Sequence, residues 1–474
     1  MTRPRRYCPG MSKTGAPNRA TVETSWRELM AALEDKVVVP GSPRYDEVRK
    51  PPIPRFHDIL PQAVVLCQTH ADVVEAMAFA RRSGTAVTVR SGGHDFAGRS
   101  SGPGIVLDLA AMHSLEVADG VATVGPGFRL GDLYAALAEH DVTIPAGCGA
   151  TVGIGGQALG GGLGLLGRSH GLTSDRVVAA QMALADGRVV ECDERRHEDL
   201  FWALRGAGAY GLGVVTNLTL RTVPEPAATS FHLKWPYERA SSLIAVWQEW
   251  SPTGPDALAA SLLVTVGSEA GADPVVHLFG SMIGSETETG ALLDEFVSGA
   301  GAEPLSSERS HMRYGSLKTY LVEQGPGDQE DEHGCSYTKS EFFREPLPAA
   351  AIEELVELFV REHRSGEARK LDFMPWGGAY NRVPADATAF PHRDELFLLE
   401  HSVVVPAEFG EAATEDARTW LSDSWELVHP SGSGGVYANF PDPDLRDEHR
   451  AYWGANLERV RQVKERYDPH AVIG

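Results

Sequence analysis

The chain has 474 residues, of which 42% are hydrophobic, and this size suits two or three domains with an interior large enough to enclose a big cofactor. Its 43 basic and 65 acidic residues give a formal net charge of -22. Because binding to phosphate backbones needs a surplus of Lys and Arg, this charge argues against nucleic acid as a partner. No stretch approaches the roughly 18 apolar residues that span a membrane, so no membrane partner is expected.

The amino terminus carries paired arginines, Arg5 and Arg6, without the apolar segment of an export signal. We interpret residues 1–44 as a leader and an N-terminal helix, and the protein as cytoplasmic. The five cysteines are widely spaced, which favours reduced thiols, and no Cys-x-x-Cys pair predicts a metal site. These cysteines are Cys8, Cys67, Cys148, Cys192 and Cys335.

The segment before the first glycine-rich loop carries the signals of a helix followed by a strand. Thr69 and Asp72 fit a capping box, and an apolar repeat then runs to Gly84, which ends it. The β-branched residues of 85–89 predict a strand that leads into the loop. Regular βαβ alternation is absent, so we expect an α+β domain. Further short strands and one helix are expected at 104–108, 115–117, 121–124 and 130–140.

The loop after that strand consists of Ser91, Gly92, Gly93, His94 and Asp95. Two adjacent glycines permit positive φ, so consecutive backbone N–H groups can converge on one phosphate. Ser91 and Asp95 can hydrogen-bond locally and hold the loop in shape. The alternative is an ordinary turn with a surface histidine.

A second glycine-rich stretch, 145–177, contains the pattern Gly153-x-Gly155-x-x-Ala158. With Asp175 further on, it matches a dinucleotide-binding fingerprint. In that fingerprint the third small residue opens a helix, whereas the glycines of 160–164 interrupt the next turn at a cost of about 1 kcal/mol each. We therefore interpret the stretch as backbone that lies flat against a broad planar ligand such as the isoalloxazine ring of a flavin.

A third glycine pattern, at 206–211, precedes a β-branched strand at 214–220 and is interpreted as a tight loop. After it the glycine clusters end. Pro224 and Pro226 mark the boundary. Residues 226–430 alternate amphipathic helices with strands and predict an antiparallel sheet flanked by helices. The expected helices are 243–250 and 352–363, and the expected strands are 262–266, 275–278, 371–374 and 397–405.

Five ordered motifs are similar to those of the berberine-bridge-enzyme-like oxidases of the vanillyl-alcohol-oxidase superfamily. The motifs are VRSGGHDFAG, TVGIGGQALGGGLG, GLTSDRVVAAQMALADGRVV, DLFWALRGAGAYGLGVVT and YDPHAV. The resemblance implies an α+β, two-domain PCMH-type FAD-binding fold. It places the FAD-binding domain at 45–225 and the substrate-binding domain at 226–430. The C-terminal segment, 431–474, would return to the FAD domain.

The resemblance also implies FAD as the cofactor, with its pyrophosphate in the first loop and the flavin joined covalently to His94. In many relatives a cysteine at the position of Gly149 forms a second covalent bond to the flavin. Two interpretations of the preceding residue, Cys148, therefore stay open: it forms this second bond, or it is a small buried residue beside the ring. In relatives, a small residue at the position of Val152 is associated with access of oxygen to the flavin. The implied FAD-binding residues are Arg90, Ser91, Gly92, Gly93, His94, Asp95, Gly98, Cys148, Thr151, Val152, Gly153, Gly155, Gly156, Gly162, Gly164, Asp175, Val177, Gly213, Val215, Tyr437 and Asn439.

Oxidation of an alcohol or amine by a flavin needs a base for the heteroatom proton. On a strand of period 2, Asp372, Trp376, Tyr380 and Arg382 share parity and would project toward one cavity if the chain stays extended. Asp372 stands where relatives carry a catalytic acid and is the first candidate for the base, against the alternative of a strand-end salt bridge. Tyr380 is a hydroxyl candidate, and Trp376 and Arg382 are substrate candidates.

Two departures from the family pattern concern the base. By resemblance, relatives place their usual bases where this chain has Arg382 and Phe440. Arg382 would instead bind a substrate anion or pair with Asp386. Tyr437 is a further catalytic candidate, with the alternative that it packs under the flavin while Asn439 hydrogen-bonds nearby.

These features predict an FAD-dependent oxidase that removes hydride from a hydroxylated or phenolic small molecule and passes the electrons to O2, giving H2O2. The resemblance implies natural-product tailoring in secondary metabolism, with a carbohydrate as the alternative substrate. A flavin-containing drug-sequestering or resistance protein without turnover is the alternative from another class. The protein is expected to be a monomer or homodimer.

Overall fold

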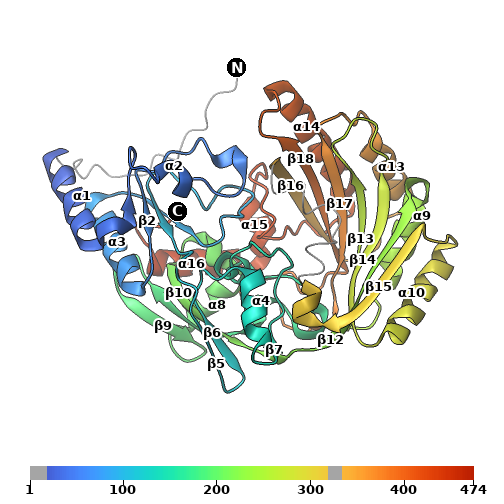
Figure 1. Ribbon diagram of the computed structural model, residues 1–474, viewed down its shortest axis with the longest axis horizontal. Helices are drawn as coiled ribbons and strands as arrows, with labels where there is room; N and C mark the ends of the chain where they lie inside the picture. Colours follow the sequence, from blue (N-terminus) through green and yellow to red (C-terminus); the bar gives the residue numbers. More distant parts are fainter. Residues whose placement is uncertain (1–18, 319–333) are drawn as a thin grey trace.

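The computed structural model describes residues 19–318 and 334–474, and the paired arginines of the amino terminus and Cys8 lie outside them. Figure 1 shows two lobes side by side. One lobe carries the amino-terminal sheets, and the other is a large sheet with helices on its outer side. The predicted N-terminal helix is α1 (Arg19–Leu33), at the far edge of the first lobe.

A four-stranded sheet in the order β1-β2-β4-β3 delivers the first glycine loop. Helix α3 joins β2 to β3, which both run parallel to β4, so this part is one βαβ unit inside an otherwise mixed domain. The capping box of Thr69 and Asp72 is confirmed, and Gly84 ends the helix at φ 67°. The elements are β1 (Val37–Val38), α2 (Tyr45–Val48), β2 (Ala63–Leu66), α3 (His70–Ser83), β3 (Val87–Arg90) and β4 (Ile105–Asp108).

A five-stranded antiparallel sheet in the order β5-β6-β10-β8-β9 completes the first lobe, and a two-stranded pair, β7 with β11, lies beside it. Its strands are β5 (Leu115–Ala118), β6 (Val121–Val124), β8 (Val177–Ala183), β9 (Val189–Asp193) and β10 (Val214–Arg221), and the pair is β7 (Val142–Thr143) with β11 (Val223–Pro224). The helices packed nearby are α4 (Leu130–Ala138), α5 (Ile154–Leu159), α6 (Gly167–His170), α7 (Thr173–Arg176) and α8 (Glu198–Ala207).

The second lobe is a seven-stranded antiparallel sheet in the order β15-β12-β14-β13-β17-β18-β16. Its strands are β12 (Ala227–Pro236), β13 (Leu258–Val266), β14 (Val275–Ile283), β15 (Ser306–Arg313), β16 (Gly334–Phe343), β17 (Ala368–Pro375) and β18 (Phe397–Pro406). Four helices cover one face, as predicted: α9 (Ala240–Trp250), α10 (Glu286–Ala300), α13 (Ala349–Val360) and α14 (Glu411–Val428).

The two faces of this sheet differ in chemistry because side chains alternate along each strand. On β17, Leu371 and Phe373 lie in the apolar core under the helices. Asp372 lies between them in sequence and Lys370 lies directly before Leu371; both side chains point to the opposite face and are only half-buried. This open face is turned toward the first lobe (Figure 1).

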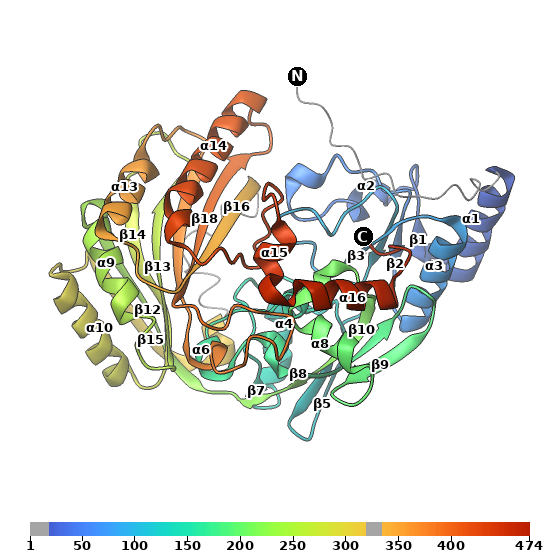
Figure 2. The same cartoon turned by 180° about the vertical axis from the view of Figure 1, so that it is seen from behind.

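The C-terminal segment lies against the first lobe. Helices α15 (Glu448–Trp453) and α16 (Leu457–Tyr467) lead back to it, and Figure 2 shows α16 running along that lobe. The Lys464 ammonium donates to the Gly211 carbonyl at 2.7 Å, and Ile473 forms a β-bridge with Val87. The last residues thus extend the sheet that carries the glycine loop.

Two expectations about the elements were incomplete. Residues Ile154–Leu159 form a short helix despite the neighbouring glycines, which end it at Gly160 rather than prevent it. Strand β15 has a mostly polar, exposed pattern, so apolar periodicity could not mark it, and it pairs only along one edge with β12. Helix α10 did carry a signal, since Ser285 and Glu288 form a capping box.

No helix among residues 19–318 and 334–474 is long and apolar enough to cross a membrane. The four cysteines in these residues carry free thiols: Cys67, Cys148, Cys192 and Cys335.

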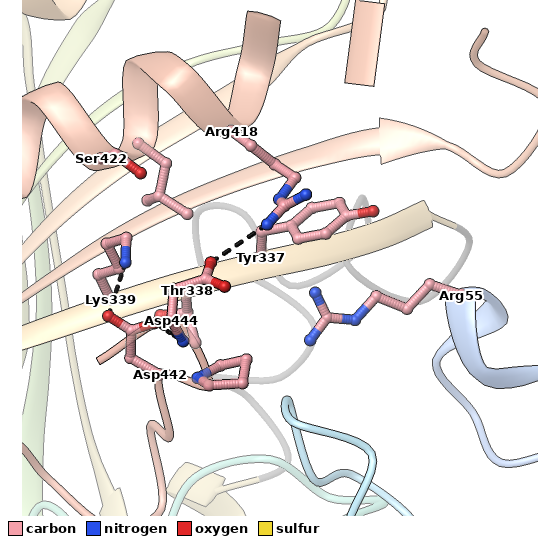
Figure 3. A pocket seen from close by; sticks show the side chains of 10 residues that line it. Arg55, Tyr337, Thr338, Lys339, Arg418, Ser422, Asp442 and Asp444 are labelled. Atoms are coloured by element: carbon pink, nitrogen blue, oxygen red, sulfur yellow. Dashed lines mark hydrogen bonds and ion pairs between the residues drawn. The ribbon is translucent and has the colours of Figure 1, made fainter. Parts of the chain in front are cut away.

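A small cavity lies where strand β16, helix α14, the C-terminal segment and the 3₁₀ helix Pro54–Phe56 meet (Figure 3). Along its wall the Lys339 ammonium and the Asp442 carboxylate form a nearly fully buried ion pair at 2.6 Å. The Arg55 guanidinium lies 4.4 Å from the centre of the Tyr337 ring. The cavity therefore joins both lobes through charged and aromatic contacts. Its lining residues are Arg55, Tyr337, Thr338, Lys339, Arg418, Leu421, Ser422, Asp442, Pro443 and Asp444.

We expect Asp442→Ala to lower the free energy of unfolding by about 3 kcal/mol or more, because it leaves the Lys339 ammonium buried without its counter-ion. The double variant Lys339→Met/Asp442→Leu should recover most of that loss. Urea unfolding followed by tryptophan fluorescence measures both. Arg188→Ala, which removes an exposed ion pair with Asp186, is the control and should cost under about 1 kcal/mol. An Asp442→Ala effect no larger than this control would contradict the assignment.

Candidate flavin-binding and catalytic site

The two glycine-rich segments touch each other at Gly92 and Gly153. A Cβ built on Gly92 would overlap the backbone of Gly153, and a Cβ on Gly153 would overlap the Ser91 hydroxyl. Ser91 Oγ in turn donates to the Pro126 carbonyl at 2.5 Å. Gly93 has φ 78°, a conformation that glycine adopts without strain. These glycines are therefore required so that the two backbones can meet.

His94 lies across the junction of the two segments. Its Nδ1 is 2.9 Å from the Gly92 carbonyl, and its Nε2 is 2.9 Å from Thr151 Oγ1. Because a carbonyl only accepts, the neutral ring carries its hydrogen on Nδ1, and Nε2 accepts from the Thr151 hydroxyl. The Arg129 guanidinium donates to the carbonyls of Gly92 and Thr151 and so holds the segments together from behind.

The open part of this cradle is the start of the second segment. Cys148, Thr151 and Gly156 are exposed, and a Cβ on Gly156 would meet nothing within 4 Å. The side-chain oxygens of Gln157 (Oε1) and Ser174 (Oγ) are buried without a hydrogen-bond partner in the described part of the chain. Exposed backbone together with unsatisfied polar side chains fits the binding of a large ligand with many hydrogen-bonding groups.

The later glycines of the run serve packing instead, which corrects the prediction that the whole run lies flat against a ligand. A Cβ on Gly160 would overlap the Asn439 amide, one on Gly162 would overlap Thr173, and one on Gly167 would overlap the Tyr380 hydroxyl. Protein side chains already occupy the space that these glycines leave.

Tyr437 is held by this run and is 2% exposed. Its hydroxyl oxygen accepts from the amides of Gly162 at 2.9 Å and Leu163 at 3.0 Å, and from Asn439 Nδ2 at 3.0 Å. Burial raises the pKa of the Tyr437 phenol above its usual value. With three donors on one oxygen, Tyr437 positions the glycine run and has no acceptor capacity left for a substrate proton.

Tyr380 plays a similar part. Its hydroxyl exchanges hydrogen bonds with the Gly164 backbone at 3.1 and 3.2 Å, and its ring stacks on Trp376 at 4.3 Å between centroids. Burial raises the pKa of the Tyr380 phenol. Both aromatic side chains are buried, so the structure directs Tyr380 away from the role of base and Trp376 away from direct substrate contact.

The expectation of an extended chain after Trp376 was wrong. Gly377 and Gly378 have φ 83° and 54°, and the backbone turns into a 3₁₀ helix, Gly378–Tyr380. The exposed Arg382 then pairs with Asp256 at 2.6 Å rather than with Asp386. Arg382 therefore lies off the sheet face that carries Asp372.

Asp372 faces a second carboxylate that the sequence reasoning missed. In the register of β17 and β18, Asp372 lies directly opposite Glu400, so their side chains share the open face. The Thr338 hydroxyl donates to Glu400 Oε1 at 2.9 Å, and Lys370 Nζ lies 3.6 Å from Glu400 Oε2. A carboxylate inside a mostly apolar strand was the available signal for Glu400.

The next cross-strand pair on the same face connects these carboxylates to the cradle. Met374 lies opposite Leu398, and both belong to a cluster that includes Leu172 and Tyr437, with Leu163 packed against it. The open sheet face thus meets the glycine run directly. The carboxylate pair lies one step further along the strands.

Other predicted FAD-binding residues are engaged in holding the cradle. The Asp175 carboxylate pairs with Arg393 at 2.6 Å and accepts from the Leu172 amide. Asp95 pairs with Arg99 at 2.8 Å, and the Arg99 guanidinium also reaches the Ala438 carbonyl. These ion pairs link the first loop and the glycine run to the C-terminal half of the chain.

The remaining predicted residues border the same region through the backbone. Arg90 is buried and donates to the Arg49 carbonyl at 3.1 Å. Gly98 has φ 78° and packs against Phe56. Three residues lie in or next to the five-stranded sheet and stay predictions as FAD contacts: Val177, Gly213 and Val215. No group of His, Cys, Asp and Glu that could hold a metal ion occurs in the part of the chain described here.

Comparison with known proteins agrees with this geometry. The FAD binding domain family matches residues 61–193, and the berberine and berberine like family matches residues 436–472. The uncharacterized FAD-linked oxidoreductase YvdP of Bacillus subtilis is 31% identical over 450 residues, which cover 93% of this chain and 97% of that protein. The chain belongs to the berberine-bridge-enzyme-like FAD-linked oxidoreductases.

Other relatives have a named activity or a solved structure. A chitooligosaccharide oxidase from Gibberella zeae is 29% identical over 435 residues, covering 86% of this chain and 85% of that protein. Among solved structures, Physcomitrella patens BBE-like 1 superposes with a TM-score of 0.85 at 27% identity, covering 94% of this chain and 97% of that one. A chitooligosaccharide oxidase structure gives 0.83 at 26% identity, with the same coverage. The PCMH-type fold and the use of FAD expected from the motifs are thereby confirmed.

A buried carboxylate anchors the glycine stretch just before Tyr437. Glu341 is fully buried, accepts from the Gly434 amide at 2.7 Å and lies 2.8 Å from His429 Nδ1. Burial raises the pKa of Glu341 to about 7, the nearby Glu395 adds to the rise, and His429 opposes it. The native state therefore holds a proton on Glu341 that the unfolded chain loses near its ordinary pKa.

Because the folded pKa of Glu341 is raised, we expect its contribution to stability to be present below about pH 4.5 and to be lost as the pH rises through about 7. Glu341→Gln should flatten the fall of the urea midpoint between pH 5 and pH 8. Glu345→Gln, an exposed neighbour, is the control. An unchanged pH dependence in Glu341→Gln would contradict the assignment.

Proposed function

We propose that this protein is an FAD-linked oxidase that removes hydride from a hydroxyl-bearing small molecule and returns the electrons to O2 as H2O2. The observation that carries the proposal is the pair of carboxylates, Asp372 and Glu400, on the open sheet face next to the glycine cradle. Oxidation of a hydroxyl group needs a base at this place.

Each residue of the proposed site has a separate role in the reaction. Bound FAD supplies the hydride acceptor. Asp372 takes the substrate proton, and Glu400, held by Thr338 and Lys370, keeps a second carboxylate beside it. The apolar contact of Met374 and Leu398 limits water between the sheet and the glycine run.

We propose that His94 is the covalent attachment point of the flavin. The hydrogen bond that Nδ1 donates to the Gly92 carbonyl and the one that Nε2 accepts from the Thr151 hydroxyl orient the ring and leave Nε2 without a hydrogen. An unprotonated imidazole nitrogen is what bond formation to a carbon requires. A fixed flavin would also have a higher reduction potential, which favours hydride removal from a weakly activated carbon.

The polar side chains on the open sheet face indicate the class of substrate. His232, His277 and Thr265 form a hydrogen-bonded chain there, with both links at 2.9 Å. Burial lowers the pKa of His232 to about 4 and of His277 to about 3, so both imidazoles are neutral at pH 7. Neutral donors and acceptors suit the hydroxyl groups of a substrate. Phenolic or glycosylated natural products are the first substrate class.

A carbohydrate is the second candidate. Two observations favour it: the polar open face and the similarity to chitooligosaccharide oxidase at 29% identity. Steady peroxide formation with mono- and oligosaccharides, compared with phenols and glycosylated aromatics, decides between the two classes. Tight binding of such compounds without peroxide would favour sequestration instead.

We expect His94→Ala to abolish the covalent adduct. Acid denaturation should leave the yellow colour on the wild-type polypeptide and release it from the variant, and mass spectrometry of the flavin peptide should identify His94. His113→Ala, a surface histidine of the same lobe, is the control and should keep the adduct. Retention of bound flavin by His94→Ala would contradict the proposal.

We expect Asp372→Asn to lower kcat by about 10²-fold or more, because the substrate proton loses its acceptor. Glu400→Gln should lower kcat less and should shift the pH profile, since it alters the partner of the base rather than the base itself. Stopped-flow bleaching of the flavin under anaerobic conditions measures the step directly. Equal, unchanged rates in both variants would overturn the assignment of the carboxylate pair.

A further inference from the structure

Arg168 is a buried arginine in α6, at the end of the glycine run, and it is 2% exposed. Its guanidinium extends into the second lobe and donates to four backbone carbonyls of the connection that leads from α9 into β13. The longest of these hydrogen bonds measures 3.2 Å. One side chain next to the glycine run thus fixes the course of a loop in the other lobe. The accepting carbonyls belong to Ser251, Pro252, Gly254 and Leu258.

The chemistry of arginine suits this contact. Its planar guanidinium presents five N–H donors in a fixed fork, whereas the lysine ammonium is a single point charge on a flexible stem. A buried cation without hydrogen-bond acceptors is strongly unfavourable, so the carbonyls must stay gathered around Arg168. The loop before β13 is therefore held in this conformation for as long as the guanidinium is present.

Two more contacts fasten α6 to the second lobe. Ser169 Oγ donates to the Asp256 carbonyl, in the same loop, at 2.8 Å. A Cβ built on Gly378 would overlap the Arg168 carbonyl, so the turn after β17 packs directly on α6. The Asp256 carboxylate also pairs with Arg382, just after that turn, at 2.6 Å. Helix α6 is thus held both by the loop before β13 and by the turn after β17.

These contacts form a closed ring that includes Asp372. Strand β17 carries Asp372, and the chain after it reaches Tyr380, whose hydroxyl hydrogen-bonds to the Gly164 backbone. Strand β13 begins at the loop held by Arg168, and its Leu263 lies directly opposite Asp372 on β17. The glycine run is therefore attached to both strands of this pair, at Gly164 through β17 and at Arg168 through β13.

We propose that Arg168 is a positioning residue, which keeps the glycine run and the flavin cradle at its start in a fixed place relative to Asp372. The inference rests on the proposed function, in which Asp372 is the base. A misplacement of about 1 Å, even one caused far from the chemistry, can cost about 10²-fold in rate. Because the Arg168 guanidinium is engaged with backbone carbonyls, it acts through the loop and not on the substrate.

The test uses the full-length, flavin-loaded protein and Arg168→Lys, which keeps the charge but cannot reach four carbonyls at once. The substrate is the compound from a panel of phenols, glycosides and saccharides that bleaches the wild-type flavin. We expect the anaerobic rate of flavin reduction at saturating substrate to fall about 10-fold or more, while the substrate Kd changes by less than about 2-fold, because alignment is lost and binding contacts stay. Flavin content should equal that of the wild type, since His94 and Arg129 hold the cradle.

Two further measurements separate position from general stability. The visible circular dichroism of the bound flavin reports its surroundings without turnover, and it should change in Arg168→Lys. Arg168→Ala leaves a space that a free guanidinium ion can fill. About 20 mM guanidinium chloride, far below the molar concentrations that unfold proteins, should raise the reduction rate of Arg168→Ala several-fold, and the same concentration of NaCl should not.

Arg369→Lys is the matched control. Arg369 is also buried and lies on β17, but it donates to the carbonyls of Phe359 and Arg361, on the sheet face that the helices cover. This variant should lower the melting temperature and leave the reduction rate and the visible circular dichroism unchanged. A wild-type rate and spectrum in Arg168→Lys, or an equal fall in Arg369→Lys, rules the inference out. If no compound bleaches the wild-type flavin, the proposed function fails, while the circular dichroism of the two lysine variants still decides whether Arg168 positions the cradle.

Discussion

The close approach of two backbone segments at Gly92 and Gly153 is the constraint on which the site depends. Neither position has room for a Cβ, so the first loop and the start of the second segment form one continuous wall. His94 and Arg129 both bridge the two segments. Each donates to the Gly92 carbonyl, and at Thr151 the histidine ring accepts from the hydroxyl while the guanidinium donates to the carbonyl. A larger residue at either glycine would separate these segments and the groups that they carry.

The C-terminal segment fastens this wall to the second lobe. Tyr437 and Asn439 hydrogen-bond to the glycine run, and Arg99 reaches across to Ala438. The glycines of 160–167 make this possible, because they leave room for side chains from distant parts of the chain. The same run therefore serves two purposes: bare backbone at its start lies open to a ligand, and bare backbone at its end accepts the protein's own side chains.

Side chains alternate along the strands of the second lobe, so one face of its sheet carries polar and charged groups and the other forms an apolar core. The helices α9, α10, α13 and α14 cover an apolar face, which leaves the opposite face free to carry charged and polar groups. Asp372 and Glu400 can lie side by side there because antiparallel register brings them together, and Lys370 and Thr338 compensate the charge.

The sequence by itself determined the helix before the first loop, the antiparallel sheet with helices on one side and the use of FAD, because capping residues, period-2 patterns and ordered motifs act locally. Only the tertiary structure decided that Glu400 faces Asp372 and that Tyr380, Tyr437 and Arg382 are engaged elsewhere. Such relations depend on strand register and on contacts between residues far apart in the chain, which no local pattern encodes.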